Sequence, residues 1–253
     1  MKAQYGIDAP GLVRLFFAIA FGLIAVAVLL IWLSLPNAVW ANRLAVVLAS
    51  PALYSLGMGC LMVFESLYTK LSNKERLLDL VAWTGAEQVL DVGCGRGRGM
   101  FLVAAAKRLT SGTATGIDIW RSEDQSANNS AGALENARRE GVLDRVAVET
   151  ADMRKLPFPD GSFDLITSGW AVHNLHALSD RAQALSEMVR VLRSGGTIIL
   201  SDIVNRTEYY DAFVRLGLRD VKIIVDQPLR DWILRTVSFG SYQPAAVIAH
   251  AAN

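Results

Sequence analysis

Two long uncharged stretches near the N-terminus constrain most strongly what this chain can fold into. Residues 15–35 contain Ser34 as their only polar side chain, and residues 44–64 carry no charge. Each stretch has 21 residues, and a helix of that length rises about 30 Å, the thickness of the hydrocarbon core of a bilayer. The sequence therefore predicts two membrane-spanning helices.

The polar connection between these stretches is short, so the two helices must form an antiparallel hairpin. Basic residues lie mainly outside it: Lys2 and Arg14 precede the first stretch, Lys70, Lys74 and Arg76 follow the second, and Arg43 alone lies in the connection. Basic residues accumulate on the cytoplasmic side of membranes. We therefore expect a multi-pass protein with two spans, whose termini and C-terminal domain are cytoplasmic.

Two features of the hairpin allow alternatives. The first stretch can be interpreted as a signal peptide cleaved near Val39-Trp40-Ala41, but it is longer than a typical signal core and the second stretch would still anchor the protein. Small residues four positions apart let helices approach closely. The pairs Ala18/Gly22 and Ser55/Gly59 favour either a tight hairpin or a homo-oligomer formed through it.

The rest of the chain has the composition of a water-soluble domain. Residues 65–253 carry 45 of the 49 charges, about a quarter of that segment. The chain has 25 basic and 24 acidic residues, which gives no reason to expect a nucleic acid as partner. Cys60 lies in the second apolar stretch and Cys94 far from it, so a disulfide between them is excluded. We divide the chain into a membrane segment, 1–64, and a domain, 65–253.

The start of the domain contains a helix signal. Ser72 with Glu75 three positions later is a capping-box pattern, and Gly85 is a stop signal. This predicts a helix over residues 73–83. The mixture of Leu, Tyr and Trp with Lys and Arg over residues 67–83 is also typical of segments that lie at a membrane surface.

A glycine-rich loop follows an apolar strand at residues 88–92 and precedes an alanine-rich helix at 100–109. Strand, glycine loop and helix form the nucleotide-binding unit of many α/β proteins. The glycines alternate at 93, 95, 97 and 99, which does not match the G-x-G-x-x-G pattern of dinucleotide-binding proteins. The loop also lacks the Lys-Ser/Thr pair of a P-loop.

Three acidic residues stand at the ends of successive predicted strands. Asp91 precedes the glycine loop, Asp118 ends the strand 113–119, and Asp152 follows the strand 145–150. A carboxylate attracts an ammonium group, accepts hydrogen bonds from both hydroxyls of a ribose, and can accept one from an adenine amino group. One such acid alone is typical of a solvated strand end. Together, these three describe S-adenosylmethionine.

At this point the sequence resembles the class I S-adenosylmethionine-dependent methyltransferases, in particular the ubiquinone/menaquinone-biosynthesis group. The resemblance covers residues 73–226 and rests on the segments 89–95, 116–118, 152–164 and 190–196. It implies an α/β fold: a Rossmann-like, doubly wound, seven-stranded sheet with an antiparallel last strand, here preceded by two transmembrane helices. The final elements are expected as a helix at 206–217 and strands at 221–226 and 245–251.

The resemblance also implies roles for individual residues. The methionine part of the cofactor is bordered by Asp91, Gly93, Gly95 and Gly97, the ribose by Asp118, and the adenine by Asp152 and Met153; Ser168, at the end of the fourth strand, adjoins the cofactor. Arg96 and Arg98 stand in the loop, where either can pair with the methionine carboxylate or remain solvated.

The segment after Asp118 is longer than usual for the family and is a candidate lid. Ile119 and Trp120 can stack on the adenine, and Gln125 or Asn128 can bind the acceptor. The alternative is a surface loop with a buried tryptophan.

The end of the fourth strand, 163–168, is where the methyl acceptor is expected. Trp170, His173 and Asn174 follow it, and His173 is the best candidate for a catalytic base, which an acceptor that carries a proton requires. Its alternative role is to cap or pack. His173 and His176 lack the companions of a metal site, so no metal is expected. The strip 228–242, which contains Trp232, suits a membrane face or a lipophilic acceptor, or else a packed crossover.

We therefore expect a membrane-anchored methyltransferase that uses S-adenosylmethionine, contacts the lipid bilayer, and methylates a lipophilic small molecule: a quinone, another isoprenoid or a lipid head group. One alternative is a tethered methyltransferase acting on a soluble metabolite or a protein. Another is a non-catalytic sensor that binds S-adenosylmethionine.

Overall fold

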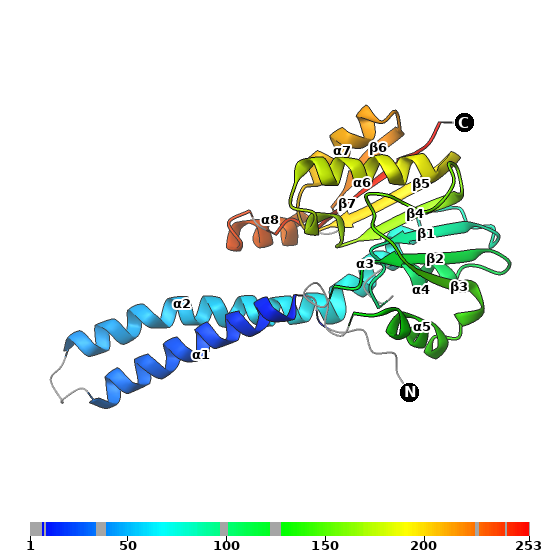
Figure 1. The fold of residues 1–253 in the computed structure, drawn as a ribbon. Helices are drawn as coiled ribbons and strands as arrows, with labels where there is room; N and C mark the ends of the chain where they lie inside the picture. The colour runs from blue at the N-terminus through cyan, green and yellow to red at the C-terminus, as the bar shows by residue number, and fades with distance from the viewer. Residues whose placement is uncertain are drawn as a thin grey trace. The chain divides into compact units, whose positions relative to one another are not determined.

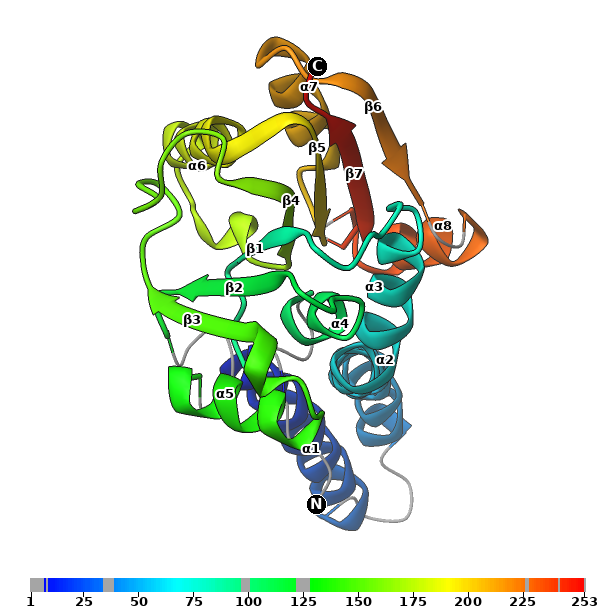
Figure 2. The same ribbon diagram turned by 90° about the vertical axis from the view of Figure 1, so that its right-hand side faces the viewer.

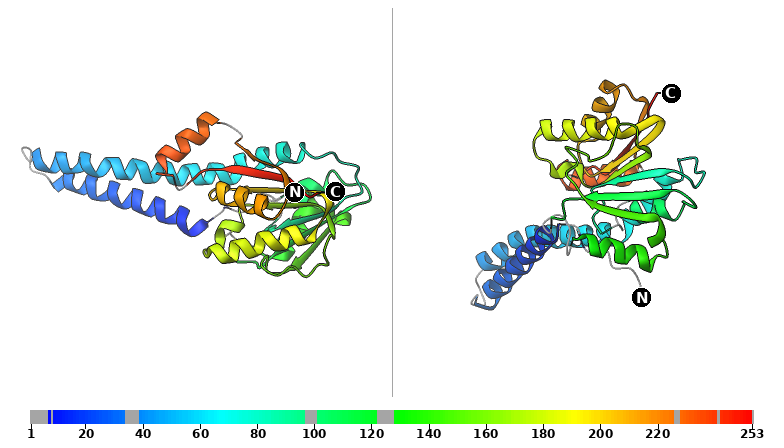
Figure 3. Two further views of the ribbon diagram at one scale, coloured as in Figure 1. Left: turned by 90° about the horizontal axis from the view of Figure 1, so that it is seen from above. Right: turned by 45° about the vertical axis from the view of Figure 1, so that its right-hand side comes forward.

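The computed structural model describes residues 7, 9–33, 39–96, 101–121, 128–225, 228–240 and 242–252, without the side chains of residue 41 and residues 68–73. It divides near residue 70 into two compact units, a helical hairpin and an α/β domain (Figure 1, Figure 3). Each unit is described separately.

The hairpin consists of α1, Pro10–Leu33, and α2, Val39–Phe64 (Figure 1). Small residues let these helices approach: Ala20, Ala52 and Ser55 are buried, and a Cβ atom on Gly59 would lie 3.2 Å from the Phe17 ring. The predicted Ser55/Gly59 pair therefore packs inside the hairpin. The Ala18/Gly22 pair does not, because Ala18 is exposed and the space beside Gly22 is open.

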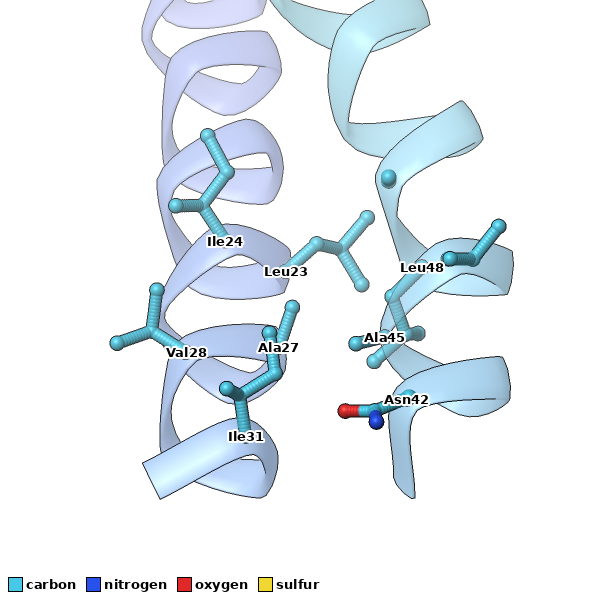
Figure 4. Close-up of a pocket in the computed structure, with 10 residues that line it drawn as sticks. Leu23, Ile24, Ala27, Val28, Ile31, Asn42, Ala45 and Leu48 are labelled. Atoms are coloured by element: carbon cyan, nitrogen blue, oxygen red, sulfur yellow. The ribbon is translucent and has the colours of Figure 1, made fainter. Parts of the chain in front are cut away.

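Both helices are long and apolar enough to cross a membrane. Only 6% and 17% of the residues in their most apolar windows are buried, so neither resembles the core helix of a soluble protein. The hairpin also contains an apolar groove of about 440 Å³ between the two helices. Figure 4 shows Leu23, Ala45 and Asn42 beside it, and Asn42 is the only polar residue among those that line it.

Helical structure continues from α2 through a π-helical turn, η1 (Glu65–Thr69), into α3 (Lys70–Leu78). The helix predicted over residues 73–83 thus begins and ends earlier than expected. Ser72 lies inside α3, where no free helix N-terminus exists to be capped. The helix ends at Leu78, whose carbonyl accepts a hydrogen bond of 2.8 Å from the Trp83 indole N–H.

The α/β domain is built on a seven-stranded sheet with the order β3-β2-β1-β4-β5-β7-β6. Only β7 runs antiparallel to its neighbours, β5 and β6, whereas the pairings among β1 to β5 are parallel. The fold class predicted from sequence is confirmed. The strands are β1 (Gln88–Val92), β2 (Thr113–Asp118), β3 (Val146–Thr150), β4 (Phe163–Gly169), β5 (Leu192–Asp202), β6 (Arg219–Ile224) and β7 (Ala245–His250).

Helices cover both faces of the sheet (Figure 2). On one face, α3, α4 (Leu102–Ala106) and α5 (Ser130–Arg139) enclose one apolar cluster, and on the other α6 (Leu178–Val191) and α7 (Arg206–Arg215) enclose a second. Two short 3-10 turns, η2 (Leu143–Arg145) and η3 (Val172–Asn174), and the helix α8 (Pro228–Val237) complete the domain. Strand order reverses between β1 and β4, and ligands of such sheets bind beyond the carboxyl ends of the strands at this point.

Candidate active site

Asp91 lies near the end of β1 and is completely buried. Its carboxylate accepts hydrogen bonds from the Leu102 backbone N–H at 2.8 Å and from the Thr167 hydroxyl at 2.9 Å. Burial raises the pKa of Asp91 to about 7, although these two hydrogen bonds and the charge of Lys74 act in the opposite direction. Asp91 thus joins β1, α4 and β4 beneath the glycine loop.

The turn after β1 depends on glycine at two positions. Gly93 and Gly95 have φ values of +75° and +49°, a region that glycine adopts readily. A Cβ atom on Gly93 would lie 2.3 Å from that of Ala171, so the turn also leaves no room for a side chain. Gly97 lies outside the described residues.

Asp118, the last residue of β2, accepts a hydrogen bond from this turn. One carboxylate oxygen accepts from the Gly95 N–H at 2.9 Å, and the other accepts from the Trp120 N–H at 2.6 Å and from the Asn128 amide at 3.3 Å. Asn128 is 8% exposed, and its buried side-chain oxygen has no hydrogen-bond partner among the described residues. A buried acceptor without a donor beside Asp118 suits a ligand that carries hydroxyl groups.

The segment after Asp118 is described only in part. The Trp120 indole N–H donates to the Thr150 hydroxyl at 2.8 Å, and the ring packs against the apolar cluster under α4, which agrees with the alternative of a packed tryptophan. Ile119 is 43% exposed and remains available to a ligand. The predicted contribution of Gln125 lies outside the described residues.

Asp152 follows β3 and pairs with a neighbour. The Arg154 guanidinium contacts both carboxylate oxygens, with a shortest distance of 2.6 Å, and these hydrogen bonds lower the pKa of Asp152. Arg154 also donates to Asp180 at 2.9 Å. Met153 is partly buried against the cluster under α6. Asp152 is therefore held ionised next to the sheet, with its side chain in an ion pair that the sequence analysis did not anticipate.

The end of β4 supplies the predicted acceptor side. The Ser168 hydroxyl is buried and donates to the Val92 carbonyl at 2.8 Å, so it ties β4 to β1. Trp170 has a φ of +54° and its ring meets that of Tyr242 edge-on, with 6.3 Å between centroids. This aromatic pair brings the segment before β7 to the end of β4.

His173, in η3, is held by an acid that the sequence analysis missed. Asp202, the last residue of β5, is 2% exposed; it lies 2.5 Å from His173 Nδ1 and accepts from the His173 backbone N–H at 3.1 Å. Asp202 also accepts a hydrogen bond from the Tyr209 hydroxyl at 3.0 Å. Burial and the Asp202 charge raise the pKa of Tyr209.

An Nδ1–H bonded to a carboxylate leaves Nε2 of the imidazole as a proton acceptor. Asn174 follows in the same turn, whereas His176 is exposed. The only signal for Asp202 in the sequence is its position at the end of the fifth strand. Among the described residues, no three His, Cys, Asp or Glu side chains are grouped so that they could hold a metal.

Comparison with known proteins identifies this domain. Residues 90–200 match the family described as methyltransferase domain. The chain is 37% identical over 132 residues to methyltransferase GfsG of Streptomyces halstedii, covering 52% of this chain and 43% of that protein. It is 32% identical over 152 residues to demethylmenaquinone methyltransferase of Symbiobacterium thermophilum, covering 58% and 53%. The chain spans about half the length of the curated relatives it matches.

The fold agrees with that assignment. The structure of geranyl diphosphate C-methyltransferase from Streptomyces coelicolor superimposes with a TM-score of 0.58 at 19% identity, covering 76% of this chain and 84% of that one. The α/β domain therefore has the fold of class I, S-adenosylmethionine-dependent methyltransferases. The residues present fit this cofactor: Gly93 and Gly95 have no side chain in the turn, and among the described residues the buried Asn128 oxygen beside Asp118 has no hydrogen-bond partner.

Proposed function

We propose that this chain is a membrane-anchored methyltransferase that transfers the methyl group of S-adenosylmethionine to a lipophilic small molecule, a quinone, another isoprenoid or a lipid head group. In this proposal the hairpin of α1 and α2 spans the bilayer, with both termini and the methyltransferase domain in the cytoplasm. The bilayer and the acceptor dissolved in it are the partners.

The observation that carries the proposal is the presence of two largely exposed, membrane-length apolar helices directly before the methyltransferase domain. An enzyme confined to a membrane encounters a substrate confined to the same membrane without searching the aqueous volume. The demethylmenaquinone methyltransferase relative is named for a quinone, and the geranyl diphosphate C-methyltransferase neighbour for an isoprenoid. These names support the substrate class.

Methyl transfer is an in-line displacement. Bound S-adenosylmethionine would supply an electrophilic methyl group to an electron pair of the acceptor. The protein must align the two reactants and exclude water, and alignment supplies most of the rate. Asp118, Asn128 and the turn at Gly93 and Gly95 would hold the cofactor, and the Trp170–Tyr242 pair would border the acceptor.

His173 provides what an acceptor hydroxyl needs. With Nδ1–H donated to Asp202, 2.5 Å away, Nε2 would accept the proton that the acceptor oxygen loses as the new bond forms. Tyr209 and the Ile203 N–H, at 3.0 and 2.8 Å, stabilise the Asp202 carboxylate. The imidazolium that forms is then paired with a buried carboxylate.

The proposed function is tested by following a labelled methyl group from the cofactor to its acceptor. Full-length protein in detergent is incubated with methyl-labelled S-adenosylmethionine and host membranes, and label is counted in the organic, aqueous and protein fractions, with Asp118→Ala as the blank. We expect label in the organic fraction that the blank lacks. Label confined to the aqueous or protein fraction would instead indicate a soluble acceptor, and no label in any fraction would favour a non-catalytic sensor.

The role of His173 is tested by a matched pair of histidine variants. His173→Ala should lower kcat about 10²- to 10⁴-fold, the usual contribution of a general base, and leave cofactor affinity unchanged. His176→Ala, three residues later and exposed, should leave both unchanged. An unchanged kcat in His173→Ala would show that the acceptor atom loses no proton to this residue.

A further inference from the structure

Helix α8 presents an apolar face away from the domain. Of the eleven large apolar side chains that are exposed in the described part of residues 71–252, five lie between 229 and 239. They are Leu229, Trp232, Ile233, Val237 and Phe239, which are 71%, 65%, 45%, 41% and 89% exposed. Exposed apolar side chains are ordinary when scattered, whereas a concentration of this kind indicates a contact surface.

The helix has two faces with different tasks. Asp231, Leu234 and Ser238 are buried against the domain, and Asp231 pairs with Arg206 of α7 at 3.2 Å. With about 100° between successive residues of a helix, the exposed apolar residues of α8 occupy an arc of roughly 140° opposite this buried face. Arg230 and Arg235 fall at the two borders of that arc.

Two local features make this face suitable for an apolar environment. Thr236, the only polar residue within the arc, donates its hydroxyl to the Trp232 carbonyl at 2.8 Å, so it can leave water with its hydrogen bond already made. Phe239 follows the helix with a φ of +52°, a conformation that costs a non-glycine residue about 1 kcal/mol or more. This strained turn holds the most exposed aromatic ring of the segment outside the domain.

We propose that α8 with Phe239, residues 228–239, is a membrane-docking helix that lies in the interface of the bilayer to which the hairpin anchors the protein; the inference rests on the membrane anchor of the proposed function. Interfacial helices carry Trp, Phe and Leu on one face and basic residues at its borders, where arginines reach lipid phosphates and their stems remain in apolar surroundings.

A second copy of the chain is a weaker candidate for this face. A helix of 10 residues is only about 15 Å long, which offers far less than the roughly 800 Å² that each partner buries in a standard interface. A bilayer has no such requirement, because the hairpin already confines the domain to its surface. Docking would also place the acceptor side at the membrane, since Tyr242, three residues beyond Phe239, contacts Trp170.

The test uses full-length protein in lipid nanodiscs with an environment-sensitive fluorophore on one cysteine. Cys60 is exposed and is replaced by serine, whereas Cys94 is buried and does not react. The probe is placed at Trp232→Cys on α8, at Val214→Cys on α7 as an exposed control within the same domain, and at Val47→Cys on α2 to report the hairpin. Nanodiscs contain phosphatidylcholine with or without phosphatidylglycerol, and quenching by a nitroxide-bearing lipid is measured.

We expect the probe at 232 to emit at shorter wavelength than the probe at 214 and to be quenched several-fold more strongly, with a further increase in phosphatidylglycerol. The outcomes separate the two proposals. Quenching at 47 but equal, weak quenching at 232 and 214 would overturn the docking of α8 and leave the anchor intact. Absence of quenching at 47 as well would overturn both. Circular dichroism of each variant confirms that the labelled proteins are folded.

Substitutions of exposed residues on α8 test membrane docking without disturbing the fold. Trp232→Ser with Phe239→Ser should lower turnover of a membrane-borne acceptor several-fold while cofactor affinity stays the same, because both side chains are exposed. The matched control, Leu178→Ser with Val214→Ser, removes exposed apolar groups from α6 and α7 and should leave turnover unchanged. Equal turnover in the two double variants would contradict the proposal.

Discussion

In the proposed function, single side chains at the strand ends hold the cofactor, and Asp118 makes the most hydrogen bonds among them. It accepts from the Gly95 and Trp120 N–H groups and from the Asn128 amide, so it orders both segments that would border the cofactor. Hydrogen bonds to a charged group contribute about 1.5–3 kcal/mol each. Asp118→Ala should therefore weaken S-adenosylhomocysteine binding roughly tenfold to hundredfold.

Isothermal titration calorimetry measures this effect, with Asp160→Ala as the control. Asp160 is also an acid of this domain and forms an ion pair with Arg190, but its side chain is 81% exposed. Its replacement should leave cofactor affinity unchanged. Equal affinity in the two variants would mean that the ribose is held by other residues.

Asp91 makes the stability of the domain depend on pH. Its pKa is raised by burial from 3.8 to about 7, so the folded state holds a proton that the unfolded chain releases at lower pH. A raised pKa contributes stability that is present below the unfolded value and is lost as pH rises through the folded value. From this group alone, the free energy of unfolding should fall by about 4 kcal/mol between pH 4 and pH 9.

The measurement compares melting temperatures of the wild type and Asp91→Asn in detergent over this pH range. The Asp91→Asn variant should be less stable than the wild type at low pH, because its amide nitrogen cannot accept one of the two hydrogen bonds that Asp91 receives from Thr167 and Leu102. The slope is therefore the quantity of interest. We expect a flatter profile for Asp91→Asn, and parallel profiles would show that Asp91 does not titrate in this range.

Among the connections between elements, the turn after β1 leaves little room for change at Gly93. Gly93 and Gly141 have nearly the same φ, +75° and +74°, but a Cβ atom would lie 2.3 Å from Ala171 at Gly93 and in open space at Gly141. Gly141→Ala should cost about 1 kcal/mol from backbone strain alone. Gly93→Ala should cost several-fold more, since strain and steric clash add.

Chemical denaturation of each variant gives the two free energies of unfolding. Ala171→Gly in the Gly93→Ala background removes the clashing methyl group and should restore most of the difference between the two glycine variants. If Gly93→Ala and Gly141→Ala proved equally stable, the close approach of Gly93 to Ala171 would not exist in solution.

Most strands could be predicted because their apolar runs are bounded by glycines and acids. The structure ends β4 at Gly169 and β7 at His250, each within one residue of the prediction. Helix ends were less predictable. The Ser72–Glu75 pattern can cap a helix only where a helix begins. Residues 72–75 instead lie inside a helical segment that runs without a break from α2 through η1 into α3.

Helix α8 was not predicted because its apolar side chains face away from the core. Helices are recognised by an apolar stripe that faces the core, but two of the three residues that α8 and the turn after it bury, Asp231 and Ser238, are polar. Its apolar stripe faces outward. Asp202 escaped for a different reason: its contact with His173 joins residues 29 positions apart, which no local spacing reveals.

In the proposed function, the whole molecule combines a membrane hairpin, a methyltransferase domain and an acceptor that resides in the lipid phase. This combination predicts how the rate of methyl transfer depends on the amount of acceptor. A membrane-bound enzyme with a membrane-bound substrate responds to the mole fraction of that substrate in the bilayer and not to its concentration in the whole sample.

Diluting the acceptor within the membrane therefore tests whether the enzyme takes it from the bilayer. Full-length protein is reconstituted into vesicles containing host lipid extract, and methyl transfer to the organic fraction is measured as inert phosphatidylcholine is added either to the same vesicles or as separate ones. We predict that the rate falls in proportion to dilution within the same vesicles and stays constant when the added lipid is in separate vesicles. A rate that is indifferent to both additions would contradict the account, because the acceptor would then reach the enzyme from water.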